Sequence, residues 1–168
     1  DLILNITSSK DYYKEIKDII NSEFDNLNQR PEDIEIDFSP KSIKEAILTD
    51  ANVNYVAKTA DVKSFGSGFD GKFLLTTSIL TNPYLYELIR AKGGAYGAYL
   101  SINRNGLLSA YSYRDPRIMG TIENFNQIGD LVNNINISDR DFENQQIGVM
   151  GSILSPQSAP NKGEIDFI

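Results

Sequence analysis

One stretch, Asn82 to Asp115, most constrains the fold of this chain, because the period of its hydrophobic pattern changes partway along it. Its first part shows helical spacing, with apolar residues at Leu85, Leu88 and Ile89. Asn82 is the predicted N-cap and Pro83 the first helical residue, because proline fixes a helical φ and lacks only an N–H that would have no partner there. The helix is predicted to end at Gly93-Gly94, where left-handed backbone angles cost nothing.

Beyond the two glycines the pattern becomes that of β-strands. Residues 95–102 and 107–113 are predicted to form two strands, rich in tyrosine and small side chains. Asn105-Gly106 between them is a strong signal for a two-residue hairpin turn. The sequence therefore predicts a helix followed directly by an antiparallel hairpin.

The reversal at the two glycines directs two polar side chains toward one point. Arg90 lies in the last predicted turn of the helix, and Tyr96 lies at the beginning of the strand. A guanidinium and a phenol placed together can stabilise a carbonyl oxygen that is gaining negative charge. Alternatively, Arg90 only complements the C-terminus of the helix and Tyr96 packs in the core. The spacing by itself leaves both interpretations open.

Composition excludes several classes of function. The net charge of −7 and the pI near 4.6 argue against a nucleic-acid partner, which is bound through clustered Lys and Arg. No apolar run approaches the roughly 20 residues of a membrane span, so no membrane partner is expected. Cysteine and histidine are both absent, so a zinc site or a Ser-His relay cannot be assembled from this chain alone.

The rest of the chain predicts an α+β fold with a mixed, mostly antiparallel sheet and helices packed on one face. The predicted elements are strands at 2–6 and 53–56, a loop or edge strand at 34–38, and helices at 8–27, 73–80, 121–134 and 138–153. The strand at 53–56 is expected to be central, and the helix at 8–27 to pack in the core. Because both ends look cut, residues 1–168 are expected to be a single domain of a longer protein.

Arg114 and Asp115 invite a catalytic interpretation as neighbouring charges. We expect instead a structural ion pair at the exit of the hairpin. A carboxylate beside a guanidinium has a lowered pKa and is a poor general base.

Several motifs together resemble one known family. They are the run from Arg90 to Gly97, Tyr84-Leu-Tyr86 before it, Ser112-Tyr-Arg-Asp-Pro116 after it, residues 53–56, and Pro160-Asn-Lys-Gly163. The chain resembles the C-terminal region of the pitrilysin/insulinase-like zinc metallopeptidases, and among them the presequence protease branch. The resemblance covers nearly the whole chain, in the family's order.

The resemblance implies a metallopeptidase-repeat domain, the fourth of a clamshell that encloses a peptide-digesting chamber, cut before its final helix or strand. The family's zinc is bound by a His-x-x-Glu-His motif in the N-terminal half of the same polypeptide, so zinc would serve the full-length protein and none would bind this chain. Arg90 and Tyr96 would contact the carbonyl of a short unfolded peptide in the transition state. Lys92, Gly93 and Gly94 would belong to the substrate-binding segment, with the glycines permitting the reversal and Lys92 facing either the chamber or solvent.

Two functions follow from the resemblance. In the first, the parent is an active endopeptidase and this fragment is inactive alone. In the second, the domain is a non-catalytic structural or peptide-binding module, since some relatives have lost the metal motif. Arg90 and Tyr96 favour the first.

Overall fold

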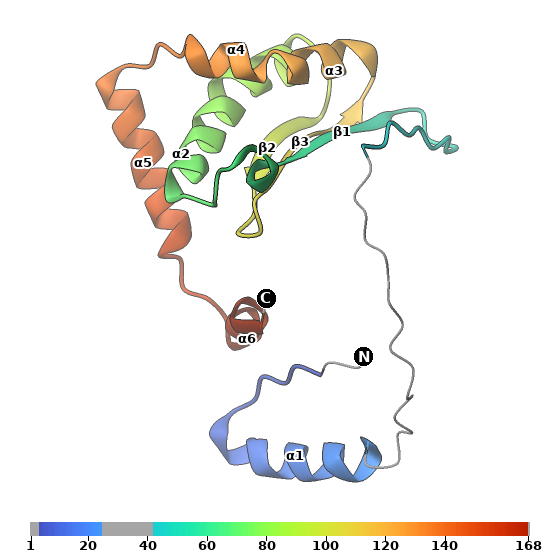
Figure 1. The fold of residues 1–168 in the computed structure, drawn as a ribbon, viewed down its shortest axis with the longest axis vertical. Coiled ribbons are helices and arrows are strands. Elements are labelled where there is room, and N and C mark those ends of the chain that lie inside the picture. The colour runs from blue at the N-terminus through green and yellow to red at the C-terminus, as the bar shows by residue number, and fades with distance from the viewer. Residues whose placement is uncertain (1–3, 25–41, 168) are drawn as a thin grey trace. The chain divides into compact units, whose positions relative to one another are not determined.

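The structure, a computed structural model, describes residues 4–24 and 42–167 (Figure 1). The chain divides into two compact units. One is the continuous segment Ile47–Leu154, and the other combines Asp1–Ala46 with Ser155–Ile168. The motifs from Arg90 to Pro116 all lie in the first unit.

The unit Ile47–Leu154 is built on a three-stranded antiparallel sheet. The strands are β1 (Asn54–Asp61), β2 (Gly97–Ile102) and β3 (Leu107–Asp115), in the order β1-β3-β2. The predicted α+β class and the predicted hairpin are confirmed. The strand predicted at 53–56 exists as part of β1, but it lies at the edge of this sheet rather than at its centre, because β3 pairs with both neighbours.

The loop of the hairpin is longer than predicted. The Asn103 N–H donates to the Leu107 carbonyl at 3.1 Å, and the Gly106 N–H donates back to the Asn103 carbonyl at 3.0 Å. Three residues therefore lie between the last paired positions, and Gly106 adopts a φ of +87°. A three-residue loop that ends in a left-handed residue fits the strand twist as well as the predicted two-residue turn does.

A long helical segment precedes the hairpin and changes its hydrogen-bonding pattern along its length. It consists of α2 (Gly71–Ile79), an α-helix, and η2 (Leu80–Ala91), a π-helix, with helical backbone angles at the junction. Asp70 caps α2, and the hydrogen bond from the Lys72 backbone N–H lowers the pKa of the Asp70 carboxyl. The helix predicted at 73–80 is confirmed, but the predicted break at Asn82 is wrong.

The π pattern explains how Pro83 is accommodated inside a helix. In this pattern each N–H donates to the carbonyl five residues earlier, so the partner that Pro83 cannot serve is Ser78. The Asn82 side-chain amide donates to that Ser78 carbonyl at 3.3 Å. Asn82 thus compensates for the missing N–H of Pro83 instead of capping a new helix.

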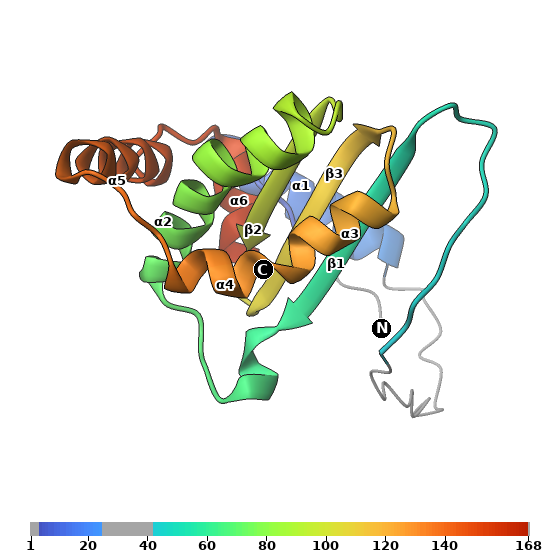
Figure 2. The same cartoon turned by 90° about the horizontal axis from the view of Figure 1, so that it is seen from above.

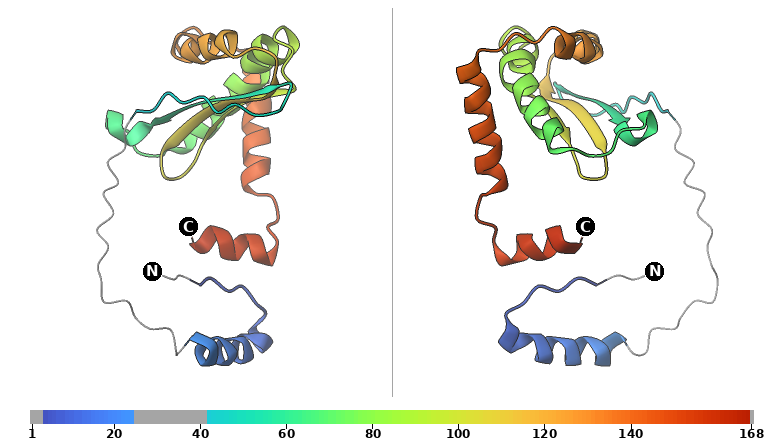
Figure 3. Two further views of the ribbon diagram at one scale, coloured as in Figure 1. Left: turned by 90° about the vertical axis from the view of Figure 1, so that its right-hand side faces the viewer. Right: turned by 60° about the vertical axis from the view of Figure 1, so that its left-hand side comes forward.

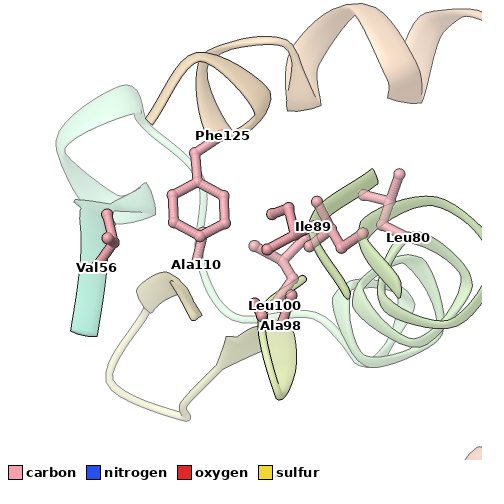
Figure 4. Close-up of a cluster of buried hydrophobic side chains, with 9 residues drawn as sticks. Val56, Leu80, Ile89, Ala98, Leu100, Ala110 and Phe125 are labelled. Carbon is pink, nitrogen blue, oxygen red and sulfur yellow. The ribbon is translucent and has the colours of Figure 1, made fainter. Parts of the chain in front are cut away.

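Helices cover one face of the sheet. Side chains from all three strands meet η2 and α3 (Met119–Asn126) in one hydrophobic core (Figure 4). Leu85 and Ile89 of η2 are fully buried there, and Phe125 of α3 is nearly so. Burial of each such side chain contributes about 1.5–3 kcal/mol relative to exposure. The prediction of helices packed on one face is confirmed (Figure 2).

Two further helices complete this unit. The predicted helix at 121–134 is divided at Gln127 into α3 and α4 (Ile128–Asn133), and α5 (Asp139–Ile153) follows (Figure 3). The predicted cap of α5 is confirmed, because the Asp141 N–H donates to the Ser138 hydroxyl at 3.2 Å. A short 3₁₀ helix, η1 (Val62–Phe65), links β1 to the loop before α2.

The second unit contains α1 (Lys10–Phe24) and α6 (Ala159–Phe167). The helix predicted at 8–27 is confirmed over Lys10–Phe24, but no residue of α1 is buried, contrary to the expected core position. Residues 4–6 of the predicted first strand are irregular, and α6 was not predicted. The expectation for 34–38 lies outside the described residues. None of the described helices combines the length and apolar character that crossing a membrane requires.

Candidate functional site

The turn at Gly93-Gly94 carries the chain from the helical layer into the sheet. Gly94 has a φ of +82°, a conformation that favours glycine. Its N–H donates to the Arg90 carbonyl at 2.9 Å, and the Ala95 N–H donates to the Ile89 carbonyl at 3.1 Å. These two bonds satisfy the last carbonyls of η2 and fix the direction in which the chain leaves the helix.

Gly93 has a different reason to be glycine. It is buried, and a Cβ atom there would collide with the Ile89 carbonyl oxygen and with the Arg117 guanidinium. The Arg117 guanidinium itself donates to the Leu88 carbonyl at 3.3 Å. The close approach of η2 to the segment after β3 therefore depends on the absence of a side chain at Gly93.

Arg90 and Tyr96 come together on the two sides of this turn. The Arg90 guanidinium carbon lies 5.8 Å from the centre of the Tyr96 ring and 4.9 Å from that of the Tyr86 ring. Arg90 is exposed, and the Tyr96 side chain is 64% exposed. The expectation that Tyr96 packs in the core is not met. An exposed guanidinium within about 6 Å of two aromatic rings is attracted to both of them.

The aromatic contacts continue from Tyr96 across the sheet. Tyr113 of β3 lies edge-on to Tyr96, with ring centres 5.8 Å apart, and Tyr55 of β1 lies edge-on to Tyr113 at 5.4 Å. Tyr99 and Tyr111 stack at 5.2 Å in the same sheet, where they are register partners. These side chains are exposed and alternate along the strands with the core residues, so they form the face of the sheet opposite the core.

Arg114 and Asp115 do not form the expected ion pair. Among the described residues, the ion pairs are Lys72 with Asp70 and Lys92 with Glu87. Asp115 is fully buried, and its carboxylate accepts from the Thr121 hydroxyl at 2.6 Å and from the Arg117 backbone N–H at 2.8 Å. Asp115 therefore joins the end of β3 to α3 through hydrogen bonds, which is a structural role of another kind.

Arg114 points elsewhere because of an irregularity in the sheet. Its φ of +49° is positive, and the register of β1 against β3 shifts between Asn54 and Val56, next to this position. Such a bulge turns one side chain out of the regular alternation. The Arg114 guanidinium carbon lies 5.7 Å from the centre of the Tyr113 ring.

Lys92 is exposed, and its ammonium lies 3.2 Å from a carboxylate oxygen of Glu87.

Within the described part of the chain, no group of three or more His, Cys, Asp or Glu side chains is placed to bind a metal ion. A recess of about 480 Å³ lies between α2, β2 and α5, but neither Arg90 nor Tyr96 lines it. The exposed cluster of Arg90, Tyr96 and Tyr86 is thus the candidate site.

Sequence reasoning missed Tyr86 as a member of this cluster and Tyr113 as a neighbour of its Tyr96 ring. A signal for Tyr86 was available, because it lies four residues before Arg90, and residues at that spacing are neighbours on a helix. No comparable signal existed for Tyr113, since its contact with Tyr96 depends on the pairing of β2 with β3.

The fold and the site define an α+β domain that presents an arginine and a tyrosine at the end of the open face of its sheet. The family described as the PreP C-terminal domain matches residues 44–168, and the chain belongs to this family. The predicted resemblance to the presequence protease branch, in its C-terminal region, is confirmed.

Named relatives agree with this assignment. Protein HypA of Clostridium perfringens is 31% identical over 166 residues, which cover 98% of this chain and 17% of that protein. Presequence protease 1, chloroplastic/mitochondrial, of Arabidopsis thaliana is 31% identical over 71% of this chain and 11% of its own length. The mitochondrial presequence protease of Mus musculus is 25% identical over 78% of this chain and 13% of its length. The chain thus spans between about a tenth and a sixth of these relatives.

Proposed function

We propose that this chain is the C-terminal, substrate-contacting domain of a zinc-dependent endopeptidase that degrades short unfolded peptides. The observation that carries the proposal is the meeting of Arg90 and Tyr96 on an exposed surface, with 5.8 Å between the guanidinium carbon and the ring centre. Membership of a family whose relatives include presequence proteases supports it.

The chain's own residues do not fit a zinc ion, because it contains no histidine and no cysteine. The zinc and its His-x-x-Glu-His motif belong in this proposal to the N-terminal half of the same polypeptide. When bound there, zinc polarises the scissile carbonyl and activates a water molecule. This chain's part is to bind the substrate from the opposite side.

Arg90 is suited to that part because its donors are available. The guanidinium carbon lies over two tyrosine rings, and a guanidinium carries five N–H donors. No hydrogen bond joins the Arg90 side chain to another of the described residues. The N–H groups of Arg90 and the hydroxyl of Tyr96 can therefore donate to the carbonyl oxygen of a peptide as that oxygen becomes negative.

Lys92, Gly93 and Gly94 have supporting parts in this proposal. The two glycines shape the turn that holds Arg90 and Tyr96 on the same side. The Lys92 ammonium lies 3.2 Å from a Glu87 carboxylate oxygen, and its other N–H groups can donate to a backbone carbonyl of a peptide.

Variants of the full-length protein test the role of the pair. Arg90→Ala and Tyr96→Phe are each expected to lower kcat for a short peptide on the order of 10²-fold, because each removes a donor that acts mainly in the transition state. Arg104→Ala is the matched control, since Arg104 is also exposed but lies in the hairpin loop. Peptide turnover that is unchanged in both site variants would falsify the assigned role.

The alternative function is a non-catalytic structural or peptide-binding module of the same superfamily. The preceding part of the parent polypeptide discriminates between the two. A His-x-x-Glu-His motif there supports the enzyme, and its absence supports the module. The presence of both Arg90 and Tyr96 in an exposed cluster favours the enzyme.

A further inference from the structure

Arg90 and Tyr96 are each in contact with a second tyrosine that the proposed chemistry does not use. Tyr86 lies closer to the Arg90 guanidinium than Tyr96 does, at 4.9 Å against 5.8 Å. Tyr113 lies edge-on to the Tyr96 ring, with 5.8 Å between ring centres and an interplanar angle of 69°. Arg90 thus has a tyrosine neighbour from η2, and Tyr96 has one from β3.

The helical spacing of η2 brings Tyr86 beside Arg90. Residues four positions apart are neighbours on a helix surface. Leu85 and Ile89, the residues just before each of them, are fully buried and fix the rotation of the helix. Tyr86 and Arg90 must therefore project together on the exposed side.

An exposed arginine is otherwise poorly positioned. Its long side chain has several rotatable bonds, and ordering it costs conformational entropy. Each cation–π contact with a tyrosine ring offsets part of that cost. Two rings on one guanidinium favour a small set of orientations even without substrate.

We propose that Tyr86 and Tyr113 are positioning residues, with Tyr86 holding the Arg90 guanidinium and Tyr113 holding the Tyr96 ring in the geometry that meets the substrate carbonyl. This inference rests on the proposed function and adds two residues to it. Neither ring touches the reacting atoms. Each acts only through its partner in the pair.

The chain offers closely matched controls. Tyr99 is 44% exposed and Tyr86 is 46% exposed, while Tyr111 is 39% and Tyr113 is 40% exposed. Tyr99 and Tyr111 stack on each other at 5.2 Å, and within the described structure no aromatic or cation–π pair joins either ring to Arg90 or Tyr96. Replacing either one removes an exposed tyrosine of the same domain and leaves the contacts of Tyr86 with Arg90 and of Tyr113 with Tyr96 in place.

The kinetic experiment uses the full-length protein. Tyr86→Leu is expected to lower kcat roughly tenfold with little change in KM, because the guanidinium loses its preferred orientation. Tyr86→Phe is expected to stay within about twofold of the parent, since the ring and not the hydroxyl makes the contact. Tyr113→Leu is expected to act like Tyr86→Leu, and Tyr99→Leu and Tyr111→Leu are expected to leave kcat unchanged.

A double-mutant cycle separates positioning from stability. If Tyr86 acts through Arg90, Tyr86→Leu has almost no further effect on kcat in an Arg90→Ala background. An equal loss of kcat in both backgrounds, or a loss that follows the fall in melting temperature, would overturn the inference. A normal kcat for Arg90→Ala would instead contradict the proposed function, which the same set of variants thereby tests separately.

A spectroscopic measurement on the 168-residue chain tests the contact between Tyr86 and Arg90 without any turnover. Aromatic ring currents should shift the NMR signals of the Arg90 side chain, and Tyr86→Leu should move them toward the values of a free arginine, while Tyr99→Leu should not. Unshifted Arg90 signals in the parent chain would show that the guanidinium is not held, and would overturn the inference whatever the kinetics show.

Discussion

At the scale of single residues, the site depends on two adjacent glycines that are needed for different reasons. Gly94 supplies a φ of +82°, and Gly93 supplies space beside the Ile89 carbonyl and Arg117. Because the obstacle at Gly93 includes backbone atoms, the surrounding structure cannot yield easily. Arg114, near the end of β3, also has a positive φ, of +49°, which is an unusual conformation for a residue with a side chain.

Gly93→Ala is expected to destabilise the chain by about 1–3 kcal/mol, because the added methyl group must displace η2 or the segment after β3. The measurement is the free energy of unfolding in urea. Gly148→Ala is the control, since Gly148 lies inside α5 with no atom near its missing Cβ, and alanine there should stabilise by roughly 0.5–1 kcal/mol. Equal effects of the two substitutions would contradict the close approach at Gly93.

At the scale of elements, the helical segment from α2 through η2 connects the core to the site. Its buried side contains Leu85 and Ile89, and its exposed side contains Tyr86 and Arg90. Thr81 of the same segment also protects the free edge of β2, because its hydroxyl accepts from the Leu100 N–H at 3.0 Å. The segment is held on its other side by α5, where the Ser78 hydroxyl donates to Gln145 at 2.8 Å.

The cap of α5 gives a test at this scale. Ser138→Ala is expected to cost about 1 kcal/mol of stability, because it removes the hydroxyl that accepts from the Asp141 N–H. Thermal unfolding measures the loss. Ser152→Ala is the matched control, since Ser152 is an exposed serine in the last turn of the same helix, and it should have little effect. A larger loss at Ser152 than at Ser138 would argue against the cap.

At the scale of the whole molecule, the proposed function assigns this chain one side of a reaction and assigns the zinc to another part of the parent polypeptide. It has no histidine or cysteine, and its described residues form no cluster that could bind a metal ion. The purified 168-residue chain is therefore expected to show no turnover of a fluorogenic peptide, with or without added zinc. Turnover by this chain that a chelator abolishes would contradict the proposal that the zinc is bound by another part of the parent polypeptide.

The candidate site was only partly predictable from the sequence. The spacing of Arg90, Gly93-Gly94 and Tyr96 indicated that the two side chains can converge, because local turn chemistry acts over these few residues, but it left the alternative with Tyr96 in the core open. The prediction for Asn82 was wrong. Asparagine is suited both to capping a helix and to donating to a backbone carbonyl, and Asn82 donates to the Ser78 carbonyl. The contacts of Tyr113 with Tyr96 and of Tyr55 with Tyr113 depend on strand pairing, which is a non-local feature.

The sequence by itself determined the local elements of this protein: the hydrophobic period of its helices, the hairpin, the serine cap of α5 and the reversal at two glycines. It also determined that the chain has no histidine and no cysteine with which to bind zinc. Tertiary structure decided the rest, namely the edge position of β1, the contact of Tyr113 with Tyr96, and the burial of Asp115 without an ion pair. The physical reason is that periodicity and turn chemistry act over a few residues, whereas strand order, helix register and burial depend on contacts between segments far apart in the sequence.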